Sequence, residues 1–320
     1  MSGDLGPRVV IAAALELLDS IPELQLILVG DQGQLEPLLA LAQISPDRLR
    51  IHHAPDRVSM DDEPLSALRH KKTSSMWVAL ELVRDDQAQA CVSAGNTGAL
   101  MAMSRHLIKT LPGIDRPAIC KSMPVAEGRS LMLDLGANLE CTPEQLQQFA
   151  HMGSVLARAT GDTQPKVALL NIGIEENKGT EVLQAAHRLL REDQRLNYVG
   201  FIEASDILAG RVQVIVCDGF SGNVALKASE GVARLIRQKM REAFQRSFWR
   251  KLLAVCASPV LRQLSVELNP AAYNGASFLG LHKIVVKSHG SADQRAFAQA
   301  LRVAIEQVSQ KIPERIAAQL

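Results

Sequence analysis

Short apolar runs alternate with amphipathic helical segments along most of the chain. Six runs have the length and composition of buried strands: 24–29, 88–93, 131–135, 167–172, 212–217 and 284–287. Strands that alternate with helices predict a three-layer α/β fold, in which a mostly parallel sheet carries helices on both faces. Ligands of such sheets bind at the carboxyl ends of the strands, so we expect functional residues in the loops after these runs.

The stretch 239–269 breaks this alternation, because it is helical in character and contains no strand. Pro259 is expected to mark a turn, so we interpret the stretch as a helical hairpin inserted into a single α/β domain of residues 1–320. Such a hairpin suits a membrane surface or a partner's groove, and a dimer-interface or core helix is an equal alternative. Aromatic and basic residues are interleaved in it: Phe248, Trp249, Arg246 and Lys251.

Charge and cysteine content exclude several classes of protein. The chain has 35 Lys and Arg against 34 Asp and Glu, a balance that argues against nucleic-acid binding. The five cysteines form no C-x-x-C pair and no zinc-spaced cluster with histidine, so we expect no metal site and no disulfide framework. No apolar run approaches the roughly 20 residues of a membrane span, and the start of the chain lacks the pattern of a secretory signal. Gly30–Gly33 is only a fragment of a dinucleotide fingerprint, so no cofactor is expected.

Two loops share the pattern Gly-x-(Thr/Ser)-Gly, each between an apolar run and a helix: Gly95–Gly98 and Gly219–Gly222. Glycines let backbone N–H groups approach an anion, and a helix N-terminus adds positive potential. The hydroxyl groups of Thr97 and Ser221 can donate a further hydrogen bond. A tight turn with a helix cap explains either loop alone, but two such loops in one sheet favour an anion site.

Other predicted strand ends also hold polar residues. Lys178 precedes a helix, where a cation is slightly unfavourable, so a contact with phosphate is favoured over a solvated lysine. Asp134 and Asn138 follow the run 131–135, where Asp134 is either a reactive group or a ligand of loop N–H groups. His289 is a candidate base or cap, although a lone loop histidine is usually structural.

A short basic run, Arg69–Lys72, precedes a predicted helix start. Cations are favourable at a solvated helix end, which explains the run without any partner. The alternative is a docking patch for an acidic protein, with Lys71 and Lys72 as its charges.

Several of these motifs recur with others in one order across nearly the whole chain. The segments are Met60–Asp62, Lys71–Met76, Ser93–Ala99, Leu111–Pro117, Leu133–Asn138, Leu170–Gly173 with Lys178–Gly179, Val216–Asn223 with Lys227, and Lys287–Gly290. In combination they resemble the bacterial phosphate acyltransferase family, also called PlsX. The combination is much more specific than any single loop.

The resemblance implies that acyl-[acyl-carrier protein] and phosphate are converted into acyl phosphate and free carrier protein, for phospholipid (phosphatidic acid) biosynthesis. It implies a fold related to isopropylmalate dehydrogenases and phosphotransacetylases, and a homodimer. It also implies a cytoplasmic protein at the membrane periphery, whose product passes to a membrane glycerol-3-phosphate acyltransferase. The family usually begins with a strand that ends in Asp-x-Met-Gly-Gly-Asp. This chain starts at Met1 without that strand, so an unpaired sheet edge is expected.

This chemistry requires an anion held beside a thioester and stabilisation of the developing oxyanion, without a strong base or covalent nucleophile. We expect the phosphate to bind at Gly95, Thr97, Lys178, Ser221 and Gly222. The expected catalytic residues are Asn96, which also contacts the phosphate and donates to the reacting centre, and Asn138, Asn223 and His289, which polarise the carbonyl or protonate the thiol. The expected dock for the acidic carrier protein consists of Lys71, Lys72, Arg246 and Lys251.

Two alternatives remain at this point. One is another enzyme on the same fold, either a phosphotransacetylase or a nicotinamide-dependent dehydrogenase. The other is a non-catalytic module that binds the carrier protein and releases no thiol.

Overall fold

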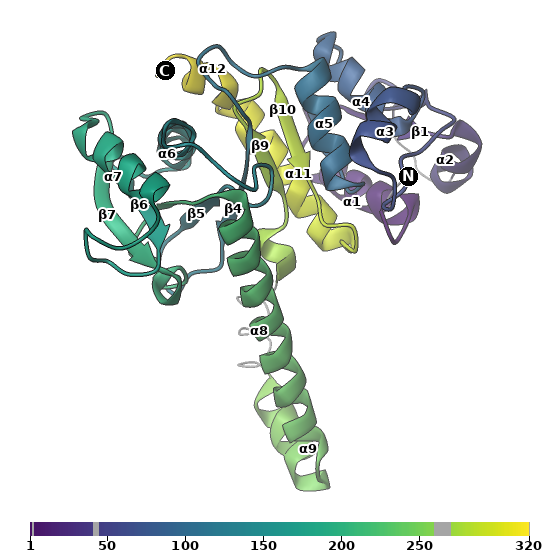
Figure 1. The fold of residues 1–320 in the computed structure, drawn as a ribbon. Helices are drawn as coiled ribbons and strands as arrows, with labels where there is room; N and C mark the ends of the chain where they lie inside the picture. Colours follow the sequence, from purple (N-terminus) through teal and green to yellow (C-terminus); the bar gives the residue numbers. More distant parts are fainter. Residues whose placement is uncertain (2, 41–44, 259–269, 320) are drawn as a thin grey trace.

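The structure is a computed structural model that describes residues 1, 3–40, 45–258 and 270–319. An α/β body carries one long helical arm, which projects away from it (Figure 1). The strands are β1 Leu26–Gly30, β2 Leu49–His53, β3 Ala90–Ser93, β4 Ala118–Met123, β5 Ser130–Leu133, β6 Lys166–Asn171, β7 Asn197–Glu203, β8 Val214–Val216, β9 Ala276–Leu279 and β10 Ile284–Lys287. The α-helices are α1 Pro7–Ser20, α2 Gln32–Leu39, α3 Pro64–His70, α4 Ser75–Arg84, α5 Thr97–Leu107, α6 Pro143–Ala159, α7 Glu181–Glu192, α8 Gly219–Gln245, α9 Phe248–Cys256, α11 Gln294–Ser309 and α12 Ile312–Ala317.

Eight strands form one sheet in the order β3-β10-β9-β4-β5-β8-β6-β7, and β1 pairs with β2 in a separate parallel pair. Neighbours in the large sheet are parallel except around β9 and β4, which run antiparallel to their neighbours. The predicted α/β fold with a mostly parallel sheet is therefore confirmed, and all six predicted runs contain strands. The run 24–29 lies outside the large sheet, contrary to the expectation of one sheet.

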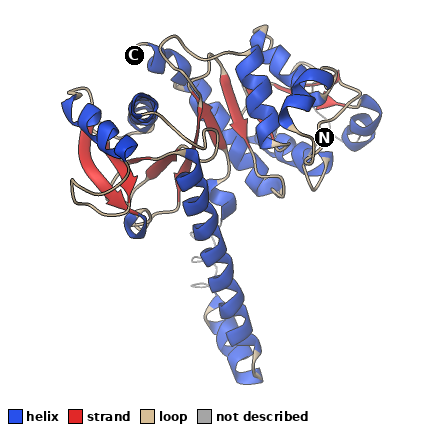
Figure 2. Cartoon of the chain, in the orientation of Figure 1, coloured by secondary structure: helices blue, strands red, loops and turns tan. Residues whose placement is uncertain are grey.

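Helices cover both faces of the large sheet (Figure 2). Successive residues of β8 are buried on opposite faces of this sheet. Ile215 packs into one apolar cluster, while Val214 and Val216 pack into another. The first cluster contains residues of α4 and α5, and the second contains residues of α6, α7 and α12. A strand whose successive side chains are buried on opposite faces belongs to the middle layer of three.

The start of α8 is pressed against the loop after β5. A Cβ atom at Gly222 would stand 1.9 Å from the Asp134 carbonyl oxygen, and one at Gly219 would stand 2.6 Å from the Asn138 carbonyl oxygen. Only glycine fits such an approach of two backbones. These two positions fix the helix that carries much of the site described below.

The arm consists of α8 and α9, and α9 lies at its far end (Figure 1). α8 runs unbroken from Gly219 to Gln245, so the predicted start of the hairpin at Lys239 falls inside this helix, and the hairpin stays a prediction. Phe248 and Trp249 are 74% and 72% exposed at the start of α9. The expected return helix after Pro259 lies outside the described residues, and the assignment of 1–320 to a single domain stays a prediction.

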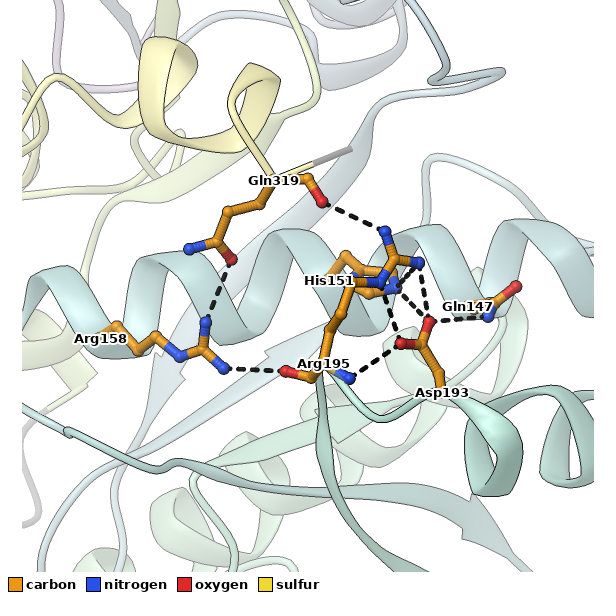
Figure 3. A network of polar contacts seen from close by, with 6 residues as sticks. All are labelled: Gln147, His151, Arg158, Asp193, Arg195 and Gln319. Atoms are coloured by element: carbon orange, nitrogen blue, oxygen red, sulfur yellow. Dashed lines mark hydrogen bonds and ion pairs between the residues drawn. The ribbon is translucent and has the colours of Figure 1, made fainter.

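A buried polar network joins α6 to the turn between α7 and β7 (Figure 3). The Asp193 carboxylate, with a side chain only 5% exposed, lies 2.7 Å from His151 Nε2 and accepts from Arg195 at 2.9 Å. Gln147 donates to the same carboxylate at 3.0 Å, and Arg158 donates to the Gln319 side chain near the C-terminus. The hydrogen bonds from Arg195 and His151 hold the pKa of Asp193 well below its ordinary value.

We expect Asp193→Asn to lower the free energy of unfolding at pH 7 by about 2 kcal/mol, since it weakens charge-assisted hydrogen bonds to a buried carboxylate. A carboxyl group whose pKa is lower in the folded state stabilises the fold above its unfolded pKa of about 4, and this contribution is lost as pH falls. Urea denaturation at pH 7, 4 and 2.5 should therefore show a nearly constant difference from the wild type down to pH 4, which then shrinks as the pH falls further. Glu192→Gln, which neutralises the exposed neighbouring carboxylate, is the matched control. Equal losses in the two variants would contradict a role for the network.

Candidate active site

A cavity of about 480 Å³ opens where the ends of β3, β5 and β10 meet the first half of α8. The sheet places these ends together because β3 and β10 are parallel neighbours, as are β5 and β8, the strand before α8. Its lining includes ten polar or charged residues: Thr97, Arg105, Arg116, Lys121, Asn138, Asn223, Lys227, Glu230, Lys287 and His289.

The charge of this lining selects an anion. Among the described residues that line it, five cationic side chains face a single carboxylate, that of Glu230. The first residues of α5, Thr97 and Gly98, add N–H groups of a helix N-terminus to the same cavity. A small, highly charged anion such as phosphate fits these groups. Among the residues that the structure describes, no three His, Cys, Asp or Glu side chains are arranged to hold a metal ion.

Glu230 holds two lysines that come from different elements. Its carboxylate lies 3.5 Å from Lys121 Nζ on β4 and accepts from Lys227 Nζ on α8 at 3.0 Å. Burial tends to raise the pKa of Glu230, but the bond to Lys227 and the charge of Lys121 bring that pKa below its ordinary value. The carboxylate therefore stays ionised and positions both ammonium groups at the cavity.

Lys287 at the end of β10 is 8% exposed, and its Nζ donates to the Ser288 carbonyl oxygen. Burial lowers the pKa of Lys287 to about 8, with a smaller contribution from the charge of Lys227 and an opposing one from Asp4. A lysine of this kind is charged at pH 7 and loses its charge within the range in which an enzyme is readily assayed.

His289 is held with one ring nitrogen directed back into its own loop. Its Nδ1 accepts from the Ser291 backbone N–H at 3.2 Å and lies 2.8 Å from Ser291 Oγ. Asn274 orients the loop, accepting from the His289 backbone N–H at 3.0 Å. Burial lowers the pKa of His289, and Lys227 lowers it further. At neutral pH the ring is therefore neutral, with its proton on Nε2, where it can act as a hydrogen-bond donor.

The loop after β5 is built around the fully buried Asp134. Its carboxylate accepts from the backbone N–H groups of Ile119, Ala137 and Asn138, at 2.8, 3.2 and 2.6 Å. Asn138 Nδ2 donates to the same carboxylate at 3.0 Å and to the Pro117 carbonyl oxygen at 2.9 Å. Burial raises the pKa of Asp134 despite these bonds. Of the two interpretations from the sequence, the structure shows the ligand of loop N–H groups.

Four of the nine residues predicted for phosphate binding and catalysis line the cavity, namely Thr97, Asn138, Asn223 and His289. Both amide protons of Asn138 are already donated, so only its oxygen is available to a ligand. Asn223 is exposed on the first turn of α8 beside Gly136.

The remaining residues of the two Gly-x-(Thr/Ser)-Gly loops serve as turns and caps. Asn96 caps α5 by accepting from the Ala99 N–H at 3.1 Å, and its amide donates to the carbonyl oxygens of Met60 and Asp62 at 2.9 Å. The Gly95 N–H donates to Ser93 Oγ at 3.2 Å.

Ser221 bonds the Asp218 carboxylate through both its N–H and its hydroxyl, and Gly222 provides the close backbone contact described above. These contacts use the groups that were expected to bind phosphate or to catalyse. The cap interpretation therefore accounts for Gly95, Asn96, Ser221 and Gly222.

Lys178 and the expected carrier dock lie apart from the cavity lining. Lys178 is exposed in the loop after β6, where its carbonyl oxygen accepts from Asn171 Nδ2 at 3.1 Å. Lys71 pairs with Asp62 at 3.2 Å, and Lys72 Nζ lies 5.8 Å from the centre of the Trp77 ring. Arg246 follows the last turn of α8, about 28 Å along the helix from Lys227. The side chain of Lys251 lies outside the described set, and the four-residue dock stays a prediction.

The cationic residues of the cavity were missed as site residues. Lys121 lies on β4, which the sequence did not predict. Lys227 and Glu230 lie four and seven residues after Asn223, a spacing that places all three on one helix face. That spacing was the available signal, since Asn223 already began a predicted helix.

The fold is shared with a phosphotransacetylase and with a 4-hydroxythreonine-4-phosphate dehydrogenase. The structure superposes on a phosphotransacetylase from Streptococcus pyogenes with a TM-score of 0.63 at 18% identity, covering 94% of this chain and 91% of that one. A 4-hydroxythreonine-4-phosphate dehydrogenase from Klebsiella pneumoniae gives a TM-score of 0.56 at 14% identity, covering 95% of each chain. At these identities the likeness establishes the fold class alone.

Sequence comparison identifies the family. The model of the fatty acid synthesis protein family matches residues 1–315. A phosphate acyltransferase from Cellvibrio japonicus is 59% identical over 320 residues, covering 100% of this chain and 96% of that protein. The chain belongs to this family, the phosphate acyltransferases, as its motifs indicated.

Proposed function

We propose that the chain transfers a fatty acyl group from the thioester of acyl carrier protein to inorganic phosphate. One phosphate oxygen attacks the thioester carbonyl carbon, a C–O bond forms, and the C–S bond breaks. Hydrogen phosphate loses its proton as it is acylated, and the leaving thiolate takes up one proton. The products are therefore acyl phosphate and a free thiol. The observation that carries the proposal is a cavity with five cations and one carboxylate at the strand ends of a phosphate acyltransferase.

The phosphate is proposed to lie between Lys227, Lys287 and the N-terminus of α5. Phosphate is substantially anionic near pH 7, because its second pKa is about 6 to 7, and it therefore needs positioning more than activation. Lys121 and Lys227 are held by Glu230, and Lys287 is held by burial, so the cations do not need to rearrange when phosphate enters.

The thioester carbonyl is proposed to lie against His289 Nε2. The ring is neutral and donates a hydrogen bond, which strengthens as negative charge develops on the carbonyl oxygen. A neutral imidazole is a poor acid, and a thiol with a pKa near 8.5 leaves readily as thiolate. The role of His289 is therefore polarisation of the carbonyl rather than protonation of the thiol.

The deciding experiment is phosphate-dependent release of thiol from acyl carrier protein, followed with a thiol reagent. We expect release that depends on phosphate, forms a hydroxylamine-reactive acyl phosphate and uses acetyl-coenzyme A poorly. Thiol release without phosphate, or efficient use of acetyl-coenzyme A, would contradict the proposal. Binding of the carrier protein without any thiol release would favour a non-catalytic module.

The arm is proposed to pair with a second copy of the chain and to rest on a membrane surface, where the product would meet a glycerol-3-phosphate acyltransferase. Within the described ranges, no helix is both long enough and apolar enough to cross a bilayer. Apolar side chains are instead exposed in two places. Val232, Leu235 and Ile236 on α8 suit a partner helix, and Phe248, Trp249, Leu253 and Val255 on α9 suit a lipid surface.

We expect Trp249→Glu to reduce sedimentation with anionic lipid vesicles at least fivefold, because it places a charge in the exposed apolar face of α9. Turnover of the substrate in solution should not change. Arg250→Gln, on the adjacent position, is the matched control and should weaken binding only slightly. Sedimentation that is unchanged in Trp249→Glu would favour a protein interface instead.

A further inference from the structure

A second cavity continues the first along α8. It has a volume of about 220 Å³, and it shares Lys121, Glu230, Asn274 and His289 with the first cavity. The two are therefore compartments of one groove, with His289 at the boundary. The residues that belong only to the second compartment include Arg234 and Arg237 from α8 and Asp293 from the start of α11.

The charges of this compartment leave two guanidinium groups available. Glu230 is engaged with Lys121 and Lys227, and Asp293 caps α11 by accepting from the Ala296 N–H at 2.9 Å. Arg234 and Arg237 make neither a hydrogen bond nor an ion pair with the residues that the structure describes. They lie three residues apart, so they project from one side of the helix. Paired arginines of this kind suit the oxygens of a phosphate ester.

The distance along α8 matches a known feature of the proposed substrate. Acyl carrier protein presents its thioester on a phosphopantetheine arm, whose sulfur and phosphorus are separated by 13 bonds. That number corresponds to between four and five residues of extended chain, or roughly 15 Å. Lys227, where the thioester would react, lies seven residues before Arg234 and ten before Arg237, which is about 10 to 15 Å along a helix.

We propose that Arg234 and Arg237 bind the phosphodiester of the phosphopantetheine arm, which places the thioester beside His289. This assignment rests on the proposed function and adds a recognition site for the arm. The arm would lie along the groove with its sulfur in the first compartment and its phosphate in the second. The site would bind the phosphopantetheine arm and not the surface of the carrier protein, so it would recognise any carrier protein that bears this arm.

The test compares two small substrates that differ only in this phosphate, S-decanoyl-4′-phosphopantetheine and S-decanoyl-pantetheine. Thiol release is measured for the wild type and for the double variant Arg234→Gln, Arg237→Gln. We expect kcat/KM to fall roughly 30-fold for the phosphorylated substrate and to change less than twofold for the other. The KM for inorganic phosphate should stay the same. Arg241→Gln, four residues beyond Arg237 on α8, is the control and should leave both substrates unaffected.

Three results would overturn the assignment while leaving the proposed function intact. Equal losses for both substrates would mean that the arginines do not sense the phosphate. A higher KM for inorganic phosphate would place the second substrate there instead. A loss seen only with intact acyl carrier protein would assign the arginines to the carrier's surface. If the wild type released no thiol from any of these substrates, the proposed function would fall, and this assignment with it.

Discussion

Replacing Lys287 by methionine is expected to lower kcat/KM for phosphate about 100-fold. Methionine has a similar size, so the buried position stays filled while the charge beside the phosphate is lost. Because burial lowers the pKa of Lys287 to about 8, the charge should also disappear in the wild type as pH rises. The profile of kcat/KM for phosphate should therefore decline through about pH 8.

Lys287→Arg is the informative companion, since arginine keeps its charge throughout this range. Its profile should lose the decline near pH 8, even if its absolute activity is lower. The same decline in the arginine variant would mean that another group titrates there, and activity within threefold of the wild type in Lys287→Met would remove Lys287 from the phosphate site. Thermal unfolding of each variant shows whether the fold has survived the change.

His289→Ala is expected to lower kcat about 100-fold while the KM for phosphate changes less than threefold. The reason is that the Nε2 proton is proposed to act on the carbonyl oxygen, where charge develops in the transition state. The pKa of His289 is lowered by burial and by Lys227, so the ring is neutral in the working range. No loss of activity from its protonation is expected between pH 7 and 9.

Two further variants separate the roles within this loop. Glutamine can present an amide N–H in a similar place, so His289→Gln should recover part of the activity lost in the alanine variant. Ser291→Ala removes the hydroxyl next to Nδ1 but keeps the backbone N–H that fixes the ring, so its effect should be about threefold or less. A loss in Ser291→Ala as large as in His289→Ala would indicate that the loop conformation, not the ring, matters.

The sequence predicted the strands that are apolar on both sides and missed those that are not. β4 contains Lys121, whose side chain faces a charged cavity, so the run lacks the signature of a buried strand. β2 alternates with exposed residues, and β7 contains Gly200 with a φ of 98°. β9 includes the polar Ser277 among its four residues. Each of these strands is stabilised by neighbours that a local pattern does not reveal.

The site was only partly predictable for a related reason. Strand ends identify loops, and they led to four residues that line the cavity, Thr97, Asn138, Asn223 and His289. Hydrogen-bond partners decide whether a polar loop residue is available, and those partners come from distant segments. The Asn96 amide, for example, is taken up by carbonyl oxygens at Met60 and Asp62. The pairing of Lys121 with Glu230 likewise depends on how β4 and α8 meet in space.

The close backbone contacts at the first residues of α8 fix that end of the helix beside the reaction centre. A rigid tilt of the arm would therefore pivot about that end. The helix has 27 residues and is about 40 Å long. A tilt of about 10° around Gly219 would sweep its far end through roughly 7 Å, whereas Lys227, eight residues from the pivot, would shift by about 2 Å. The tip can thus follow an uneven or moving surface while the lysine beside the phosphate moves only about a third as far.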